Sequence, residues 1–319
     1  MTMDHYKRSA LNFFTASTLD RMALKRRDPQ WLATSLEAQH SRFLPIYQRK
    51  NLLSDGEIPH PVYLDYREAK TFGDISESIL LGTLEGLTYF ALPIKTASDS
   101  LSSKGKWEEL RWQASVLPHD EASLAIYAKA LSHWHERNQY CGDCGYLTLN
   151  KEAGHMRECT NPESKHMHFP RTDPAVIVLI YKGDYCLLGR QAIWPQFQYS
   201  TIAGFVEPGE SLEDAVLREA LEETGLEIKT VHYHSSQPWS FPSSLMLGYL
   251  AEANTDAINL EDQELEDAKW FSRQDIKEGL RAGTLKLPSH VAISYRLIEA
   301  WFDEGEEGKL LELMPAKDK

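Results

Sequence analysis

Three glutamates, Glu219, Glu222 and Glu223, occupy positions i, i+3 and i+4 of one short segment. On an α-helix this spacing places three carboxylates on one face, where like charges repel one another by roughly 0.3 kcal/mol per pair in water. A bound cation removes that repulsion, and ligand sets made only of oxygen favour Mg²⁺ or Mn²⁺ over zinc. The spacing therefore predicts a divalent-metal site, although a solvated acidic helix face has the same pattern.

The residues around this cluster predict the helix that carries it, over Leu212–Thr224. Ser211 is followed three residues later by an acid, which is typical of a capping-box-like start, and Gly225 stands where a helix would end. Arg218 precedes the cluster and is predicted to hold Glu210 by a fork-like ion pair. The joint occurrence of these features favours a metal site over a solvated face.

The segment resembles the Nudix box, written G-x5-E-x7-R-E-U-x-E-E-x-G-U with U bulky and apolar. Ala220 departs from the pattern because it is smaller than the usual U residue. The resemblance implies a Nudix α/β/α sandwich that hydrolyses a nucleoside diphosphate linked to another moiety. It also implies metal ligation by Glu219 and Glu223, with Glu222 contributing. The matching residues are Gly204, Glu210, Arg218, Glu219, Glu222, Glu223, Gly225 and Leu226.

A second segment, residues 236–244, has the sequence SQPWSFPSS. Two prolines and two aromatic rings in so short a loop predict a rigid platform for stacking a flat ring, such as nicotinamide or adenine. The segment resembles the SQPWPFPxS signature of the NADH pyrophosphatase branch of the Nudix family, with Ser240 in place of a proline. A proline-rich structural loop is the alternative. The substrate-binding residues predicted here are Gln237, Pro238, Trp239, Ser240, Phe241, Pro242, Ser243 and Ser244.

The same resemblance adds residues outside the two motifs. It implies Glu264 as a distal metal ligand, with Glu266 and Asp267 as neighbours to which the assignment can slip. It also implies that the carbonyl of Ala203 reaches the metal. The residues implied to contact substrate are Phe205, which stacks on the base, and Phe169 and Ser294, which line the pocket.

Together these features predict an NAD(H) diphosphatase that releases nicotinamide mononucleotide, reduced when NADH is the substrate, and AMP. Glu219, Glu223 and Glu264 are predicted to hold Mg²⁺ or Mn²⁺, and Glu223, with Glu222 second, to orient or deprotonate the attacking water. One alternative is removal of NAD caps from RNA by the same site, although a net charge of −13 argues against broad nucleic-acid binding. Another is a catalytically silent nucleotide sensor.

Three cysteines lie close together in the sequence. Cys141 and Cys144 form a C-x2-C knuckle, and Cys159 follows after 14 residues. Relatives complete a four-cysteine zinc ribbon, and here His166, or else His168, is predicted to supply the fourth ligand of a structural Zn²⁺ site. A degenerate knuckle without metal is the alternative. The fourth cysteine, Cys186, lies in a predicted strand and is expected in the core.

Composition and periodicity predict two modest domains. Strands interleaved with helices from residue 174 onward predict a mixed sheet covered on both faces. We expect a smaller strand-rich N-terminal α+β domain over 1–120, a linker helix and zinc-ribbon-like segment over 121–170, and the Nudix domain over 171–319. Strands are predicted at 61–66, 79–92, 175–181, 185–189, 227–234, 245–251 and 268–271, and helices at 121–138 and 291–304, besides Leu212–Thr224.

The longest clean apolar run, residues 175–181, is far too short to cross a bilayer. We therefore expect no membrane partner and a cytoplasmic protein, whose basic N-terminal residues are not followed by the apolar core of a signal peptide. A homodimer is implied by the resemblance alone.

Overall fold

Residues 4–15, 17–260 and 264–314 are described in this computed structural model of the chain. Their contacts form two compact units. Unit 1 comprises the described residues of 1–15, 173–239 and 244–319, and unit 2 comprises those of 16–172 and 240–243. The predicted boundaries at residues 120 and 170 stay a prediction, because contact grouping alone does not tell which segments fold independently.

Unit 1 is built on a mixed sheet in which β12, β13, β9, β10 and β14 lie side by side in that order, and β11 also pairs with β9. β13 runs parallel to β9, whereas the other pairs are antiparallel. The strands are β9 (Asp173–Lys182), β10 (Tyr185–Arg190), β11 (Ile202–Phe205), β12 (Ile228–Trp239), β13 (Ser244–Ala253) and β14 (Asp267–Ser272).

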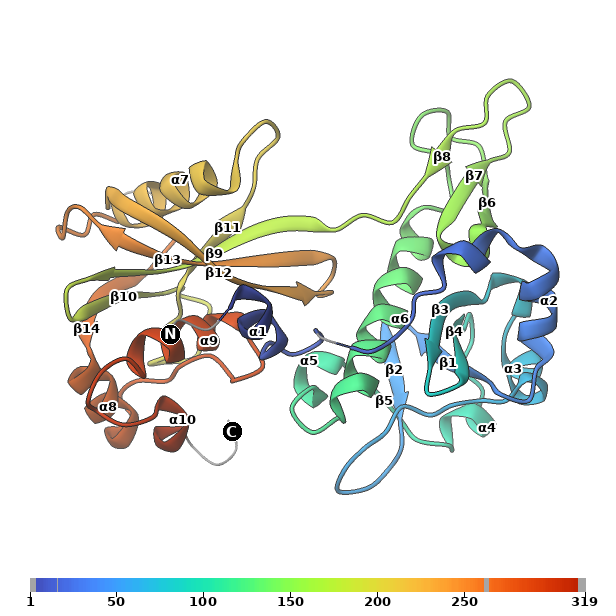
Figure 1. Ribbon diagram of the computed structural model, residues 1–319, viewed down its shortest axis with the longest axis horizontal. Helices are drawn as coiled ribbons and strands as arrows, with labels where there is room; N and C mark the ends of the chain where they lie inside the picture. The colour runs from blue at the N-terminus through green and yellow to red at the C-terminus, as the bar shows by residue number, and fades with distance from the viewer. Residues whose placement is uncertain (1–3, 16, 261–263, 315–319) are drawn as a thin grey trace. The chain divides into compact units, whose positions relative to one another are not determined.

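Strand β9 contributes to two cores, because successive side chains of a strand point to opposite faces. Val176 and Val178 pack with α7 (Leu212–Thr224) on one face. Ile177 and Leu179 pack on the other face with α8 (Arg273–Ala282) and α9 (Ile293–Phe302). The predicted α/β/α sandwich with a mixed sheet is confirmed, with α7 and α9 on opposite sides of the sheet (Figure 1).

The first described residues also belong to unit 1. Helix α1 (His5–Ala10) contacts β12, and Asn12 donates hydrogen bonds to the Ser236 carbonyl at 2.8 Å and the Ser235 hydroxyl at 3.1 Å. At the other end, α10 (Leu310–Leu313) begins with Leu310, which is buried in the same core as α9. The first and last described segments thus help to build the unit that carries the carboxylates.

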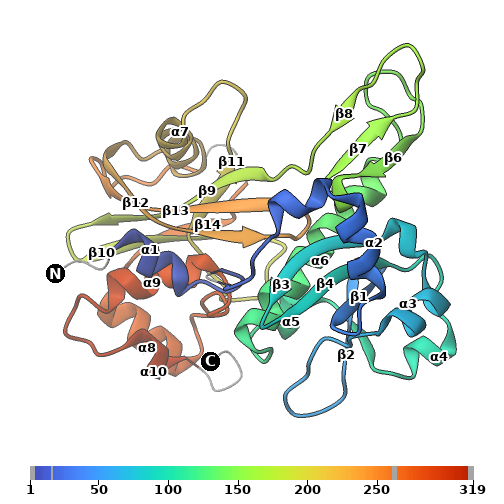
Figure 2. The same ribbon diagram turned by 45° about the vertical axis from the view of Figure 1, so that its right-hand side comes forward.

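Unit 2 contains a five-stranded sheet in the order β3-β4-β1-β2-β5, with β1 parallel to β4. Helix α6 (His119–Arg137) lies against one face of this sheet (Figures 1 and 2). It packs there through Leu124, Ala128 and Leu131. Helices α2 (Pro29–Glu37) and α3 (Tyr66–Phe72) contribute to the core on the other face. The strands are β1 (Ser41–Tyr47), β2 (Lys50–Leu53), β3 (Ile79–Leu84), β4 (Leu87–Pro93) and β5 (Lys106–Glu108).

Short helical turns connect these elements, and a small sheet with strand order β6-β7-β8 follows α6. The three strands are β6 (Thr148–Lys151), β7 (Met156–Cys159) and β8 (Met167–His168). The short helices are α4 (Asp99–Ser102), α5 (Leu110–Gln113), η1 (Ala23–Arg27), η2 (Ile75–Glu77) and η3 (Glu152–Gly154). Over the described part of the chain, no helix combines the length and the apolar character needed to span a bilayer.

One predicted strand is wrong and two predicted helices are confirmed. Residues 61–66 make only isolated bridges, and Tyr66 begins helix α3. The reason is Asp65, whose side chain accepts the backbone N–H of Glu68 at 2.9 Å in a capping box that the apolar neighbours concealed. The helices predicted at 121–138 and 291–304 are present as α6 and α9.

Candidate active site and metal cluster

Helix α7 begins and ends as its sequence requires. The Ser211 hydroxyl accepts the backbone N–H of Asp214 at 3.1 Å, and Gly225 ends the helix in the left-handed region at φ +70°. Ala215 and Val216 are fully buried against the sheet. The predicted span Leu212–Thr224 is confirmed, and its packing leaves the turn from residue 218 to 223 facing β11.

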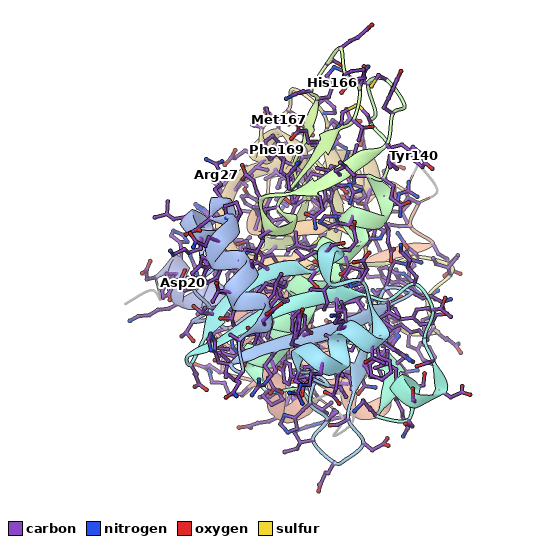
Figure 3. All side chains as sticks on the ribbon, turned by 90° about the vertical axis from the view of Figure 1, so that its right-hand side faces the viewer. Asp20, Arg27, Tyr140, His166, Met167 and Phe169 are labelled. Atoms are coloured by element: carbon purple, nitrogen blue, oxygen red, sulfur yellow. The ribbon has the colours of Figure 1, made fainter. Side chains whose placement is uncertain are left out.

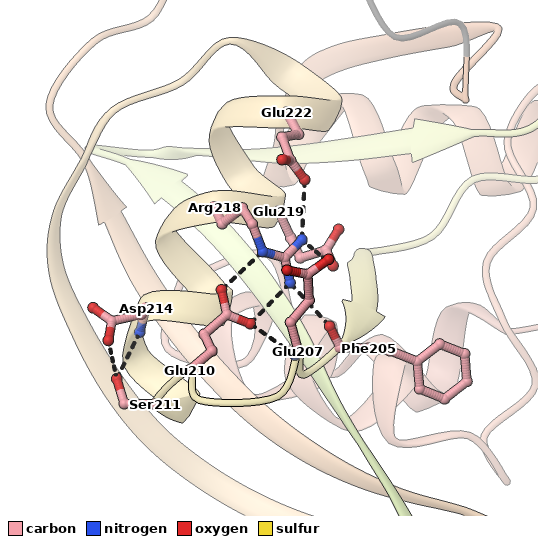
Figure 4. A network of polar contacts seen from close by, with 8 residues as sticks. All are labelled: Phe205, Glu207, Glu210, Ser211, Asp214, Arg218, Glu219 and Glu222. Atoms are coloured by element: carbon pink, nitrogen blue, oxygen red, sulfur yellow. Dashed lines mark hydrogen bonds and ion pairs between the residues drawn. The ribbon is translucent and has the colours of Figure 1, made fainter.

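Arg218 is the centre of the polar network on this helix (Figure 4). Its guanidinium donates two hydrogen bonds to Glu210, at 2.8 and 3.0 Å, which confirms the predicted fork-like pair. It also donates to Glu219 at 2.8 Å, to Glu222 at 3.0 Å and to the Phe205 carbonyl at 2.9 Å. These pairs raise the pKa of Arg218, chiefly through Glu210, and the hydrogen bonds from Arg218 lower the pKa of Glu210.

Glu219 is held between this arginine and the backbone of β11. Only 8% of the residue is exposed, and burial raises the pKa of its carboxyl group against the opposing influence of Arg218. A Cβ atom placed on Gly204 would lie 1.9 Å from Glu219 Oε1. Glycine at position 204 therefore lets the strand backbone approach the carboxylate directly, which explains the first residue of the motif.

The other acids of the cluster occupy different environments. Glu223 is buried at 3% exposure, whereas Glu222 is exposed. Glu264 accepts a hydrogen bond from Gln191 at 3.5 Å, and its charge contributes to the raised pKa of Glu219. Among the described residues, the groups whose ligand atoms all lie within 4.8 Å of one another are in the cysteine region. Glu219 itself accepts a hydrogen bond from Arg218 at 2.8 Å.

The neighbours of Glu264 differ from it in their partners. Glu266 forms an ion pair with Arg190, and Asp267 accepts a hydrogen bond from the Tyr199 hydroxyl at 2.5 Å. The contact between Gln191 and Glu264 was not anticipated from the sequence. It follows from the pairing of β10 with β14, whose register sets Arg190 opposite Asp267, and sequence patterns alone do not give such a register.

The SQPWSFPSS segment is the end of a hairpin rather than a free loop, so that part of the prediction is wrong. β12 continues to Trp239 and β13 begins at Ser244, which leaves only residues 240–243 at the tip, and these four group with unit 2. Proline is tolerated at 238 because β12 is an edge strand. The amide of Gln237 is fully buried; it donates to the carbonyls of Val291 at 2.8 Å and of Phe13 at 3.3 Å, and it accepts from the Ile293 N–H at 2.8 Å.

The remaining predicted contact residues are dispersed. Phe205 is 61% exposed, and its ring points away from Arg218 (Figure 4). Ala203 is exposed on β11 two residues earlier. Ser294 is buried in the first turn of α9, and Phe169, labelled in Figure 3, is exposed after β8 in unit 2. Within unit 1 the structure therefore brings Glu210, Glu219, Glu222 and the Phe205 carbonyl together around Arg218, with Gly204 beside Glu219, whereas Ser294 lies in the core.

The cysteines gather as the sequence predicts. Ligand atoms of Cys141, Cys144, Cys159 and His166 all lie within 4.8 Å of one another in the region of β6, β7 and β8. Two ligands at about 2.3 Å from a tetrahedral zinc are about 3.8 Å apart, so this arrangement fits the ion. Sulfur Sγ of Cys144 lies 3.4 Å from that of Cys159, and Cys141 Sγ lies 3.3 Å from Nδ1 of His166.

Two further observations bear on this cluster. The backbone N–H of Tyr146 lowers the pKa of the Cys144 thiol to about 6, which favours the thiolate that metals bind. His168 also approaches Cys141 Sγ, at 3.3 Å, but it groups with Asp143 rather than with the other cysteines. The fourth cysteine, Cys186, is fully buried in the core of unit 1, as predicted.

Comparisons with known proteins match both units. Residues 171–290 match the NUDIX domain, and residues 40–134 match the NADH pyrophosphatase-like rudimentary NUDIX domain. The NAD-capped RNA hydrolase NUDT12 of Macaca fascicularis is 40% identical over 91% of this chain and 73% of its own length. The mitochondrial NAD(P)H pyrophosphatase NUDT13 of Mus musculus is 37% identical over 72% of this chain and 72% of its own length.

A plant relative has a higher identity over a shorter region. The chloroplastic Nudix hydrolase 19 of Arabidopsis thaliana is 48% identical over 50% of this chain, and the match spans only 38% of that protein. The similarity thus extends over nearly the whole chain in one relative and over half of it in another.

Proposed function

The chain belongs to the Nudix hydrolase family, and on that premise we propose that it hydrolyses the diphosphate bridge of NAD(H) to nicotinamide mononucleotide and AMP. The observation that carries the proposal is the seating of Glu219 between Arg218 and Gly204, at the centre of the family's motif. The names of the relatives, an NAD-capped RNA hydrolase and an NAD(P)H pyrophosphatase, support a substrate that contains NAD.

We assign the metal to Glu219, Glu223 and Glu264, with the Ala203 carbonyl as a further ligand, and propose Mg²⁺ or Mn²⁺ because every donor is an oxygen. When bound, the ion neutralises charge that develops on the diphosphate.

The chain's own side chains perform the proton transfer in this proposal. Glu223, with Glu222 as the alternative, takes a proton from a water molecule whose oxygen forms a new bond to one phosphorus. The bond from that phosphorus to the bridging oxygen breaks, and the second phosphate leaves with that oxygen. Arg218 fixes Glu219 and Glu210 relative to β11, so it is a positioning residue.

Substrate recognition is assigned to aromatic side chains on and beside the sheet. The exposed ring of Phe205 is available to stack on a base, a contact for which flat aromatic rings are suited. The strands of the hairpin contribute Pro238, Trp239 and Ser244. The roles of Ser240, Phe241, Pro242, Ser243 and Phe169, which belong to unit 2, and of the buried Ser294 stay predictions from the sequence resemblance. The buried amide of Gln237 holds this hairpin to the segment before α9.

The cysteine cluster is proposed to hold a structural Zn²⁺ through Cys141, Cys144, Cys159 and His166. Four protein ligands close a tetrahedral site and leave no position for a reacting water. The role is therefore to fix the small β6-β7-β8 sheet, in which Cys159 ends β7.

The test is the substitution Glu219→Gln, which keeps the shape of the side chain and removes its charge. We expect kcat for NADH to fall by roughly 1000-fold or more, with the fold and the thermal midpoint retained. Glu213→Gln is the matched control, because Glu213 is exposed on the same helix outside the network. Near-normal turnover by Glu219→Gln in Mg²⁺ and Mn²⁺ would contradict the proposal.

NAD-capped RNA is the second candidate substrate, favoured by the name of the macaque relative. The chemistry is unchanged, because only the group on the adenosine side differs. Rates on NADH, NAD⁺ and NAD-capped RNA at matched salt, with products identified, rank the substrates. Tight NADH binding without release of AMP would instead establish a catalytically silent sensor.

A homodimer and a cytoplasmic location complete the proposal and rest on the family resemblance and on the sequence. Light scattering after size-exclusion chromatography measures the first. Imaging of the full-length protein in its own cells measures the second.

A further inference from the structure

Unit 2 contains a cavity of about 490 Å³ that no feature of the proposed reaction uses. It lies among α2, η2 and the β6–η3–β7 hairpin, all within unit 2. Its volume falls in the range of small-molecule sites. The lining residues are Arg26, Arg27, Pro29, Leu32, Leu36, Ile75, Ser76, Ser78, Asn150, Lys151, Glu152, Ala153 and Met156.

The charge of this cavity is opposite to that of the whole protein. Its lining has three cations and one carboxylate, in a chain whose net charge is −13. The carboxylate of Glu152 is engaged by Arg27, whose exposed side chain is labelled in Figure 3, at 2.8 Å. Arg26 and Lys151 remain, and among the described residues neither has an ion-pair partner. Two such cations at an apolar cavity favour an anionic ligand.

Polar atoms without partners lie on the same walls. Ser78 is 7% exposed, and within the described part of the chain neither its hydroxyl nor Oδ1 of Asn150 has a hydrogen-bond partner. The same holds for Nε of Arg26. Buried polar atoms are paired in most proteins, and each orphan costs free energy that a ligand can recover. The orphans therefore mark where a ligand's polar edge would lie.

The backbone beside these atoms is strained. Glu152 and Ala153 have φ of +48° and +53°, in the left-handed region that residues with a Cβ seldom adopt. These two successive residues lie between β6 and β7, in the segment that lines the cavity. Strain of this kind is concentrated at ligand-binding sites.

We propose that this cavity binds an adenine nucleoside 5′-monophosphate, separately from the catalytic residues of unit 1. The phosphate pairs with Arg26 and Lys151. The base lies against Leu32, Leu36 and Met156, and its amino group donates to Oδ1 of Asn150, in the way an asparagine amide reads adenine. The evidence for this site comes from the cavity alone and does not depend on the proposed function. AMP is the probe because its base carries that amino group and because the proposed function releases AMP.

The experiment is equilibrium dialysis of the full-length protein with radiolabelled AMP, without added Mg²⁺ or Mn²⁺. We expect saturable binding of AMP and at least about tenfold weaker binding of IMP, which lacks the amino donor. Lys151→Glu should weaken AMP binding by about tenfold or more. Lys70→Glu, an exposed charge reversal on α3 of the same unit, should leave it unchanged. Asn150→Ala should bring the affinities for AMP and IMP together.

Several outcomes would overturn the inference. If Lys151→Glu does not weaken AMP binding, AMP binds elsewhere, for example at the carboxylates of unit 1. Equal binding of inorganic phosphate, or binding of decanoate in place of AMP, would show an anion or acyl site rather than a nucleotide site. NADH hydrolysis is measured in the same variants and should keep its kcat in Lys151→Glu. If the protein binds AMP but does not hydrolyse NADH, only the proposed function fails. If it hydrolyses NADH but does not bind AMP in this cavity, only the present inference fails.

Discussion

The two units share an architecture and differ in what their helices present. Each encloses a mixed sheet between helices, and each matches a Nudix description, that of unit 2 being rudimentary. Helix α7 of unit 1 carries glutamates at 219, 222 and 223, whereas α6 of unit 2 has no acidic residue between positions 122 and 135. The sheet and its helices can therefore fold without the chemistry, which resides in a few side chains.

Polar networks in the two units also serve different ends. In unit 1, Arg218 gathers carboxylates at the surface of the sheet. In unit 2, Arg157 donates to His135 Nδ1 at 2.8 Å and His135 Nε2 donates to the Gly154 carbonyl at 2.8 Å, all three residues being buried. The second network satisfies backbone groups and stiffens the fold. Changes to the Arg218 network should therefore affect turnover, and changes to the His135 network should affect the stability of unit 2.

After Glu219→Gln, the largest effect is expected from Gly204→Ala. The new Cβ would overlap the Glu219 carboxylate, so kcat should fall by about 100-fold or more with little change in thermal midpoint. Gly283→Ala is the matched control: its Cβ meets nothing within 4 Å, but its φ of +71° strains alanine. That variant should lose about 1 kcal/mol of stability and keep its kcat. If both variants kept full activity, the contact between Gly204 and Glu219 would be unimportant for turnover.

The prediction of helix α7 is confirmed and that of a loop at residues 236–244 is wrong, and the two cases show which features a sequence alone can predict. Helix α7 was predictable to the residue because its cap, its Arg218 and its closing Gly225 are local signals. The prolines and serines of residues 236–244 predict a loop because they are typical of loops, but the edge position of β12 overrides that preference.

Long-range placement is the common cause of the other surprises. The burial of Gln237 depends on Val291, and the contact of Glu264 with Gln191 depends on the register of β10 with β14. The capping of α3 was local but hidden among apolar neighbours. Partners far apart in sequence carry no periodic pattern, so only the folded chain reveals them.

The next effect should appear in unit 2, through Cys159→Ala. Removal of one ligand opens the proposed zinc site, so metal analysis should find zinc near zero per chain instead of about one. We expect amide exchange to quicken in β6, β7 and β8, with a local loss on the order of 3 kcal/mol. Cys186→Ala, in the core of unit 1, is the cysteine control and should keep its zinc. An equal zinc content in Cys159→Ala and Cys186→Ala would show that Cys159 is not a zinc ligand.

A smaller effect concerns the buried histidines, of which unit 2 has the two described here. Burial lowers the pKa of His135 and of His155 to about 4, from 6.5. A histidine whose pKa is depressed on folding contributes stability that is complete above pH 6.5 and is lost as pH falls toward 4. Between pH 7 and 5 each should cost unit 2 about 2 kcal/mol.

Amide exchange of peptides from each unit, corrected for intrinsic rates, measures that loss. Unit 1 has one described histidine of this kind, His234, whose pKa burial also lowers to about 4. Unit 2 should therefore lose stability more steeply than unit 1, and His155→Gln should reduce its slope toward that of unit 1. Equal slopes in the two units would contradict the assignment of buried neutral histidines.

The smallest effect belongs to Glu210, and its pH range lies lower. Arg218 lowers the pKa of Glu210 below its ordinary 4.5, so the pair stabilises unit 1 fully above that value and stops doing so as pH falls through the lowered pKa. Urea unfolding of the wild type and Glu210→Gln should thus differ at pH 7, and the difference should shrink as pH falls below 4.5 and through the lowered pKa. Glu219 should behave oppositely, because burial raises its pKa and protonation then relieves a cost of folding. A difference between wild type and Glu210→Gln that did not shrink at any pH below 4.5 at which the protein stays folded would mean that Arg218 holds this side chain by shape rather than by charge.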